Sequence, residues 1–167
     1  VTKFDRDVNG NLLGRFVFQN DTLIEKTVCE NDIKGNVIFN SVYDKAGLSY
    51  TESREYDALD SLLVYKREKP TYPKLLSYHR FTYDPIHRKI SEEYKSMFDN
   101  GDLANEGVKS DFLYDSKGRV ISYIDSYRIS DPFTSGAFST GKEKYVYEYD
   151  NHGNIIHHRR EDADSGF

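Results

Sequence analysis

Short stretches of alternating apolar and polar residues run through the chain and favour β-strands. In "YVYEY", from Tyr145 to Tyr149, three tyrosines fall on one face of an extended segment. The stretches "RVISYID" and "KLLSYHRFTY" are similarly rich in aromatic and branched residues, which strands accommodate well. No window of comparable length makes a better helix, so the pattern predicts a protein built from strands.

The strands are separated by a recurring phrase, D-x-x-G, usually followed by a polar and then an apolar residue. Asp at the first position of a type I turn caps its own backbone, and Gly at the fourth adopts a positive φ that closes a hairpin with a bulge. Two degenerate copies place Asp60 and His87 where glycine belongs, and both residue types tolerate positive φ. The predicted turn residues are Asp7, Gly10, Asp32, Gly35, Asp44, Gly47, Asp57, Asp60, Asp84, His87, Asp115, Gly118, Asp150 and Gly153.

The turn spacing predicts the architecture. Successive turn aspartates at positions 7, 32, 44, 57, 84, 115 and 150 are 25, 12, 13, 27, 31 and 35 residues apart. The longer intervals leave room for a return strand and an opposite turn, and "FDNGDL" from Phe98 to Leu103 is a shorter turn of a different kind. We therefore expect an all-β antiparallel meander of consecutive hairpins with about ten strands. It is either extended and curved or folded into two layers.

Composition supports thin sheets. The chain has 167 residues, among them 14 Tyr, no Trp and one Met, and its mean hydropathy of -0.75 is low for a thick globule. This length suits one all-β domain over residues 1–167. The net charge of -5 is mild and both signs are interleaved, so nothing predicts a nucleic-acid partner. No apolar run approaches the ~18 residues of a transmembrane helix.

The phrases from Tyr114 to Val120, "YDSKGRV", and from Tyr149 to Ile155, "YDNHGNI", resemble the YD repeats of the RHS family of bacterial surface and secreted proteins. Weaker copies touch most of the chain. The resemblance implies extended β-sheet structure and an extracytoplasmic location, either secreted, periplasmic or at the cell surface. It implies a small stand-alone repeat domain, because the repeats are too few for the closed shells of longer family members. The motif is mainly a hairpin signature and indicates little about activity.

Sequence motifs for metals and cofactors are incomplete. The stretch from Asp5 to Leu13 copies the first half of a calcium-binding EF-hand loop, but Phe16 stands where a bidentate glutamate is required. "GAFSTGKE" has the spacing of a phosphate loop up to Lys142, but Glu143 replaces the Ser or Thr, and a strand pattern follows where a helix is needed. We predict no cofactor and no metal site, although a cross-strand pair involving His157 or His158 is left open.

Catalytic groups are equally hard to assign. Cys29 has no His close in sequence to activate a thiolate, so we interpret it as a strand residue. Charged runs explain the carboxylates Glu92, Glu93, Glu161 and Asp162 through solvation and protection of strand edges. The sequence therefore predicts a non-enzymatic domain that binds glycan or protein or has a structural role. The alternative is a glycan-acting hydrolase whose two carboxylates converge only in the fold.

Tyrosine-rich strands beside a loop are the candidate binding surface. The segment from Ser130 to Lys142 is the longest turn-rich interval and carries two phenylalanines, either as a recognition loop or as a hairpin connection that packs on the sheet. Tyrosine rings suit sugar stacking and peptide contacts, but they also pair across strands within sheets. We expect any ligand to be a glycan or an extended peptide. The candidate binding residues are Tyr123, Tyr127, Phe133, Phe138, Tyr145, Tyr147 and Tyr149.

Overall fold

The computed structural model describes residues 1–70, 75–98, 100–130 and 137–163, and all regular structure among them is β-strand. The phenylalanine candidate Phe133 lies outside these residues. The strands are β1 (Thr2–Arg6), β2 (Leu12–Gln19), β3 (Thr22–Asn31), β4 (Val37–Asp44), β5 (Gly47–Tyr56), β6 (Leu62–Lys69), β7 (Leu75–Tyr83), β8 (Lys89–Phe98), β9 (Leu103–Tyr114), β10 (Val120–Ser130), β11 (Phe138–Tyr149) and β12 (Ile155–Asp162).

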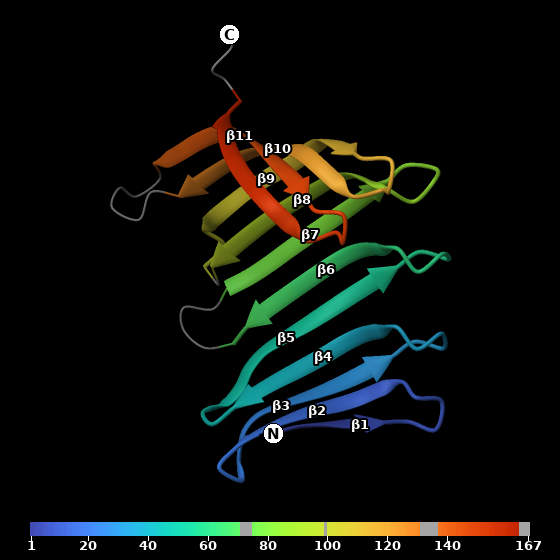
Figure 1. Cartoon of the computed structure of the whole chain (residues 1–167). Coiled ribbons are helices and arrows are strands. Elements are labelled where there is room, and N and C mark those ends of the chain that lie inside the picture. The colour runs from blue at the N-terminus through green and yellow to red at the C-terminus, as the bar shows by residue number, and fades with distance from the viewer. Residues whose placement is uncertain (71–74, 99, 131–136, 164–167) are drawn as a thin grey trace. The chain divides into compact units, whose positions relative to one another are not determined.

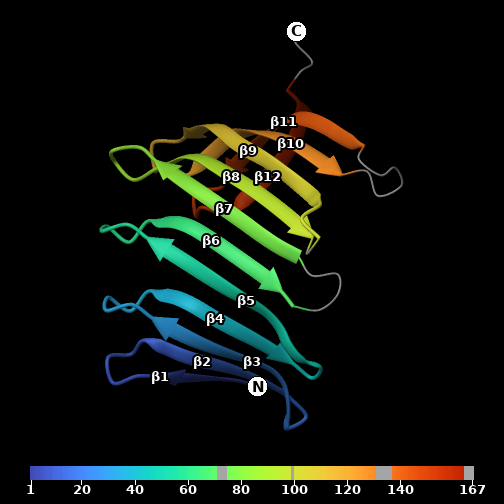
Figure 2. The ribbon, with the colours of Figure 1, turned by 180° about the vertical axis from the view of Figure 1, so that it is seen from behind.

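The strands form an antiparallel meander in which each strand pairs with its neighbours in the chain, in the order β1 to β12 (Figures 1 and 2). This confirms the predicted fold class, with twelve strands instead of about ten. The prediction missed strands because some return turns are very short. The β2–β3 turn consists of Asn20 and Asp21, both with positive φ, and carries no D-x-x-G phrase.

The chain divides into two compact units. The first comprises Val1–Tyr78 with Met97–Gly101, and the second comprises His79–Ser96 with Asp102–Phe167. Each unit is described by itself below. None of the described residues forms a helix, and hence none forms a helix long and apolar enough to cross a membrane.

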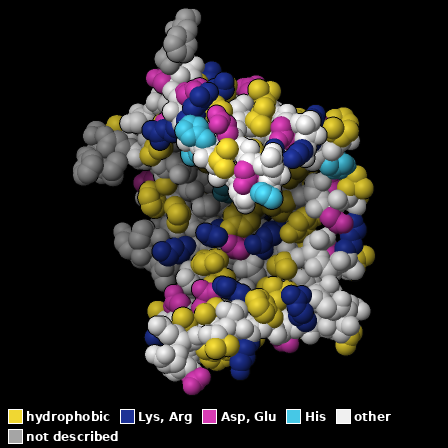
Figure 3. Space-filling model, viewed as in Figure 1, with side chains coloured by type: hydrophobic (Ala, Val, Ile, Leu, Met, Phe, Trp, Pro, Cys, Tyr) yellow, Lys and Arg dark blue, Asp and Glu magenta, His cyan; other side chains and the backbone are white. Residues whose placement is uncertain are grey.

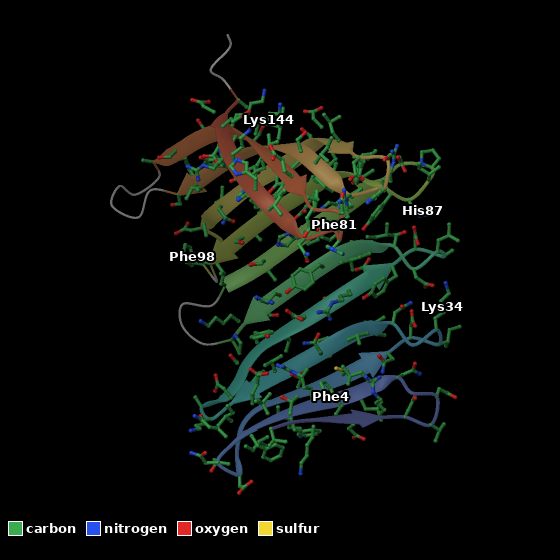
Figure 4. All side chains as sticks on the ribbon, in the orientation of Figure 1. Phe4, Lys34, Phe81, His87, Phe98 and Lys144 are labelled. Carbon is green, nitrogen blue, oxygen red and sulfur yellow. The ribbon has the colours of Figure 1, made fainter. Side chains whose placement is uncertain are left out.

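The D-x-x-G turns have the predicted geometry. At Asp150, the backbone carbonyl accepts from the Gly153 N–H at 3.1 Å, and the Asp150 N–H donates to the Asn154 carbonyl at 2.9 Å. Positive φ is found at all seven positions where the phrase requires it: Gly10, Gly35, Gly47, Asp60, His87, Gly118 and Gly153. Since Asp60 and His87 adopt the glycine conformation, the two degenerate copies are genuine turns. His87 lies at the tip of the β7–β8 hairpin (Figure 4).

The carboxylate of each of six turn aspartates accepts hydrogen bonds from the backbone of its own turn. Asp150 Oδ1 accepts from the backbone N–H groups of His152 and Asn154, and Oδ2 accepts from Asn154 Nδ2 at 2.8 Å. The same backbone contacts recur at Asp7, Asp32, Asp57, Asp84 and Asp115. The side-chain bond from Asn154, followed by its backbone bond, lowers the pKa of Asp150. The hydrogen-bonding capacity of these carboxylates is therefore used within their own turns.

Asp44 belongs to a different turn, although its phrase reads the same. Its hairpin joins β4 to β5, whereas the Asp32 turn joins β3 to β4, so the two turns lie at opposite ends of the strands. Asp44 Oδ1 accepts from the Ala46 N–H at 2.7 Å, and Asp44 pairs directly with Gly47. Without Asp44, the first three repeat turns begin at Asp7, Asp32 and Asp57, a regular spacing of 25 residues.

A side-chain hydrogen bond connects each of several hairpins to the one before it. In the second unit, the hydroxyl of Tyr149, which precedes Asp150, donates to the Val120 carbonyl at 2.8 Å. Val120 lies five residues after the preceding turn aspartate, Asp115. Three equivalent bonds have the same spacing: Asn31 to Leu12 and Tyr56 to Val37 in the first unit, and Tyr114 to Lys89 in the second. We call this contact the clip, and it gives the tyrosine of the Y-D pair a structural role.

Few apolar side chains are buried in either unit. Of the apolar side chains described, only Cys29 and Val42 are buried, whereas five polar residues are: Asn40, Glu52, Glu92, Ser122 and Asp125. Figure 3 shows acidic, basic and hydrophobic side chains interleaved on one face.

Glu52 organises the interior of the first unit. Its carboxylate accepts from Tyr65 Oη at 2.5 Å, from Arg54 at 2.6 Å and from Arg67 at 2.5 Å. Burial alone would raise the pKa of Glu52, but these donors outweigh it and hold the pKa below its usual value. Burial, with the bond to Glu52, raises the pKa of Tyr65 to about 12. This acid therefore links β5, which carries Glu52 and Arg54, to β6, which carries Tyr65 and Arg67.

Candidate functional site

A row of charged side chains crosses one face of the second unit. Lys109 on β9 pairs with Asp125 on β10, Asp125 with Glu143 on β11, and Glu143 with Asp162 on β12. Residues directly opposite each other on antiparallel strands project from the same face with Cβ atoms about 4.5–5.5 Å apart. The register therefore brings together three carboxylates that are far apart in the sequence.

Three side chains, two of them lysines, bind the Glu92 carboxylate, and Glu92 is only 6% exposed. Its carboxylate contacts His79 Nδ1 at 3.1 Å, Lys89 Nζ at 2.8 Å and Lys109 Nζ at 3.2 Å. Burial favours the neutral acid, but the bonds from His79 and Lys89 outweigh it and hold the pKa of Glu92 far below its usual value. The sequence interpretation of Glu92 as a solvated edge charge is therefore wrong, because Glu92 is buried and is bonded by Lys89 of its own strand, β8, and by His79 of β7 and Lys109 of β9.

Asp125 has a different environment from Glu92. It is 9% exposed and accepts a hydrogen bond from Tyr94 Oη at 2.9 Å. Burial raises the pKa of Asp125 above its usual value, and the Tyr94 bond and Lys109 only partly oppose this shift. Burial and the bond to Asp125 also raise the pKa of Tyr94.

Glu143 is bonded by two phenol hydroxyls. Tyr127 Oη donates to Oε1 at 2.8 Å and Tyr145 Oη donates to Oε2 at 2.9 Å, while Arg160 Nε lies 3.3 Å from Oε2. The row thus contains a buried acid with one tyrosine donor, Asp125, beside an acid with two tyrosine donors, Glu143. Both were missed by the sequence interpretation. Their only signal is alternation, because each lies two residues from a tyrosine on the same strand face.

Most of the candidate rings stack on one another across the strands. Tyr123 stacks on Tyr145 with centroids 4.9 Å apart, and Tyr147 stacks on His158 at the same distance. Phe112 continues the stack on the other side of Tyr123 at 5.2 Å. Parallel rings at strand spacing cover each other's faces, so the stack contributes mainly to sheet stability.

Two further candidates also have covered faces. The Arg119 guanidinium lies 4.5 Å from the Tyr149 ring centroid, and Arg128 lies 4.5 Å from that of Phe138. Cation–π contacts of this kind stabilise the ring where it lies. Tyr149 is in addition the donor of a clip.

Tyr127 is arranged differently from the other candidates. Its ring lies over Gly141 on the neighbouring strand, where an added Cβ would come within 2.5 Å of the ring. Glycine at this cross-strand position lets the phenol lie against the backbone. The bond to Glu143 is the main reason that the pKa of Tyr127 is raised, and it also fixes the ring orientation.

A polar pocket of about 360 Å³ lies at this place. This volume is within the ~300–1,000 Å³ range of small-molecule sites. The pocket combines one aromatic ring with cationic donors and carboxylate acceptors. Its lining residues are Tyr127, Gly141, Lys142, Glu143, Arg160, Glu161 and Asp162.

The structure places the calcium-like stretch, the phosphate-loop-like segment and Cys29 in or next to strands. The calcium-like stretch ends in β2, where Phe16 lies, and the Asp7 carboxylate is bonded to Asn9 and Asn11. Lys142 and Glu143 of the phosphate-loop-like segment lie within β11. Cys29 is buried, and burial raises the pKa of its thiol. Within the described part of the chain, no three His, Cys, Asp or Glu side chains are placed to hold a metal ion.

No protein-family model matches the chain, and no curated protein sequence matches it either. The fold and the geometry of the second unit therefore carry the functional argument.

Proposed function

We propose that this chain is a non-catalytic carbohydrate-binding repeat domain, with its binding site in the Tyr127 pocket. The observation that carries the proposal is the close placement of the Tyr127 ring over Gly141, beside Glu143 and Arg160. A sugar ring presents a C–H face that packs on a phenol ring and a rim of hydroxyls that pair with carboxylates and guanidinium groups. An apolar or highly charged ligand would suit this mixed lining less well.

The location and family are part of the same proposal. The Y-D pairs resemble YD repeats, and the clip gives that pair a structural reason. A YD-repeat protein of the RHS type would act as a secreted or cell-surface domain in a bacterium, where glycans are abundant ligands. A protein partner at the cell surface is the other ligand class that this location favours.

A glycan array with the Tyr127→Ala variant tests the binding site. We expect the unmodified chain to bind a subset of neutral or mixed-charge glycans, and Tyr127→Ala to lower affinity by about tenfold through loss of stacking. Tyr43→Ala is the matched control, because Tyr43 is an exposed tyrosine of the first unit. Equal binding by both variants, or no bound glycan, would remove the support for this site.

One observation favours a hydrolase as the second candidate. Asp125 has a raised pKa and lies directly opposite Glu143, and retaining glycosidases place their two carboxyl groups about 5–5.5 Å apart. However, both acids already have phenol donors, which suits a structural role. Incubation of each bound glycan with the chain and with Asp125→Asn separates the candidates. Release of reducing sugar that Asp125→Asn abolishes would make the protein an enzyme.

A further inference from the structure

The hairpin tips at one end of the first unit carry apolar side chains that are exposed. The turns that join β1 to β2, β3 to β4 and β5 to β6 lie at the same end of the strands, because strand direction alternates along the meander. Val8 and Ile33 are 101% and 104% exposed, and Leu59 is 68% exposed. Values near 100% mean that neighbouring residues cover almost none of the side chain. We call Val8, Ile33 and Leu59 the apolar tip row.

The turns themselves do not require apolar residues at these positions. Val8 and Ile33 stand directly after their turn aspartates. In two turns of the second unit the same position is polar, with Ser116 and Asn151, and those turns close with the same backbone hydrogen bonds. Polar residues and glycine are the usual choice for turns of this kind. The fold therefore does not explain the apolar tip row.

Adjacent tips of the first unit are held beside each other. Lys34, at the tip of the β3–β4 hairpin (Figure 4), donates from Nζ to the Ala58 carbonyl at 2.6 Å and to Asp60 Oδ1 at 2.9 Å, which joins this tip to the β5–β6 tip. An added Cβ on Gly35 would collide with Asn11 Oδ1, so the β1–β2 turn contacts the β3–β4 turn. Tips two strands apart are about 9.5 Å from each other. The apolar tip row is therefore a fixed line of side chains along one end of the sheet.

The spacing and charge of this end indicate the kind of ligand. A small molecule is too short for three tips that are about 9.5 Å apart, and a folded partner needs a separate pocket for each tip, whereas a lipid interface receives all three at once. The three tips, residues 5–11, 32–36 and 57–61, have more acidic than basic residues, which disfavours an anionic lipid surface. The acids are Asp5, Asp7, Asp32, Asp57 and Asp60, and the bases are Arg6 and Lys34.

We propose that the apolar tip row docks on the surface of a neutral phospholipid bilayer. Val8, Ile33 and Leu59 enter the interface between headgroups, and the strands behind them stay in water. The turn aspartates already accept from backbone N–H groups of the tips, so fewer free donors lose water on docking. This contact is independent of glycan binding at the Tyr127 pocket, because phosphatidylcholine carries no sugar.

Co-sedimentation of the intact chain with phosphatidylcholine vesicles is the first test. We expect saturable binding that Ile33→Asn weakens about tenfold and Val8→Ser about threefold, since each removes an inserted branched side chain. Both replacements copy residues that the chain uses at this turn position, and circular dichroism checks that the fold is kept. Leu23→Thr is the matched control, because Leu23 is 43% exposed and lies at the opposite end of β3 from Ile33.

A tryptophan reporter provides a second test that needs no loss of binding. The chain contains no Trp, so Ile33→Trp places a single indole in the apolar tip row. Its emission should shift to shorter wavelength when phosphatidylcholine vesicles are added, because the ring leaves water and indole rings suit the interface. Leu23→Trp should show no such shift.

The lipid composition distinguishes insertion of the tips from general charge attraction. Replacement of part of the phosphatidylcholine by anionic phosphatidylserine should weaken binding, because the tips carry excess negative charge. The proposal is overturned if the intact chain does not bind neutral vesicles, if Ile33→Asn and Leu23→Thr bind alike, if both tryptophan reporters shift equally, or if anionic lipid strengthens binding.

Discussion

Removing single hydroxyls tests whether the clips hold the hairpins together. Tyr149→Phe deletes the 2.8 Å bond to the Val120 carbonyl and keeps the ring under Arg119. Tyr56→Phe deletes the longer 3.3 Å bond to the Val37 carbonyl. Tyr43→Phe is the matched control, because Tyr43 also precedes an aspartate but is 37% exposed and has no hydroxyl bond among the described residues.

The expected magnitude follows from the type of bond. A neutral hydrogen bond contributes about 0.5–1.5 kcal/mol net, so Tyr149→Phe should lower the free energy of unfolding by about 1 kcal/mol. Tyr56→Phe should lie at the low end because its bond is longer and weaker. For a chain of this size, 1 kcal/mol corresponds to about 2–4 °C in melting temperature. Tyr43→Phe should change neither quantity measurably.

Urea unfolding followed by circular dichroism measures these differences, with midpoints compared at constant slope. The comparison between Tyr43→Phe and Tyr56→Phe is the sharpest, because both residues belong to the first unit. A cost for Tyr43→Phe as large as that for Tyr56→Phe, or no cost for Tyr149→Phe, would refute the structural role of the clip.

Three other predictions follow from the geometry. Gly118 has φ of 77° and open space around its missing Cβ, so Gly118→Asn should cost less stability than Gly118→Val in thermal melts, because asparagine tolerates positive φ. The pKa of Glu92 is lowered in the folded state. Its contribution to stability should therefore be complete above the unfolded-state pKa of 4.5 and should be lost as the pH falls toward the folded-state pKa. Urea titrations at several pH values should show this loss in the parent chain and less of it in Glu92→Gln. Gly141→Ala should displace the Tyr127 ring and weaken glycan binding about as much as Tyr127→Ala, as isothermal calorimetry can measure.

Local turn chemistry was readable from the sequence because a D-x-x-G phrase contains all of its own partners. The hairpin at Asp44 and Gly47 was predicted in the same way, but the phrase does not encode the end of the sheet at which its turn lies. Burial of Glu92 could not be read, because two of its three partners, His79 and Lys109, belong to other strands. Tyr127 could not be separated from Tyr147 either, since the difference depends on Gly141 lying opposite one of them.

The polar interior has a thermodynamic consequence. Exposure of apolar surface raises the heat capacity on unfolding and exposure of polar surface lowers it. Among the described apolar side chains only Cys29 and Val42 are buried, whereas carboxylates and their donors occupy much of the interior. The heat capacity change per residue should therefore fall below the usual ~12–15 cal/mol/K. Such a protein has a flat stability curve, so cooling should cost it little stability and cold denaturation should lie far below the freezing point.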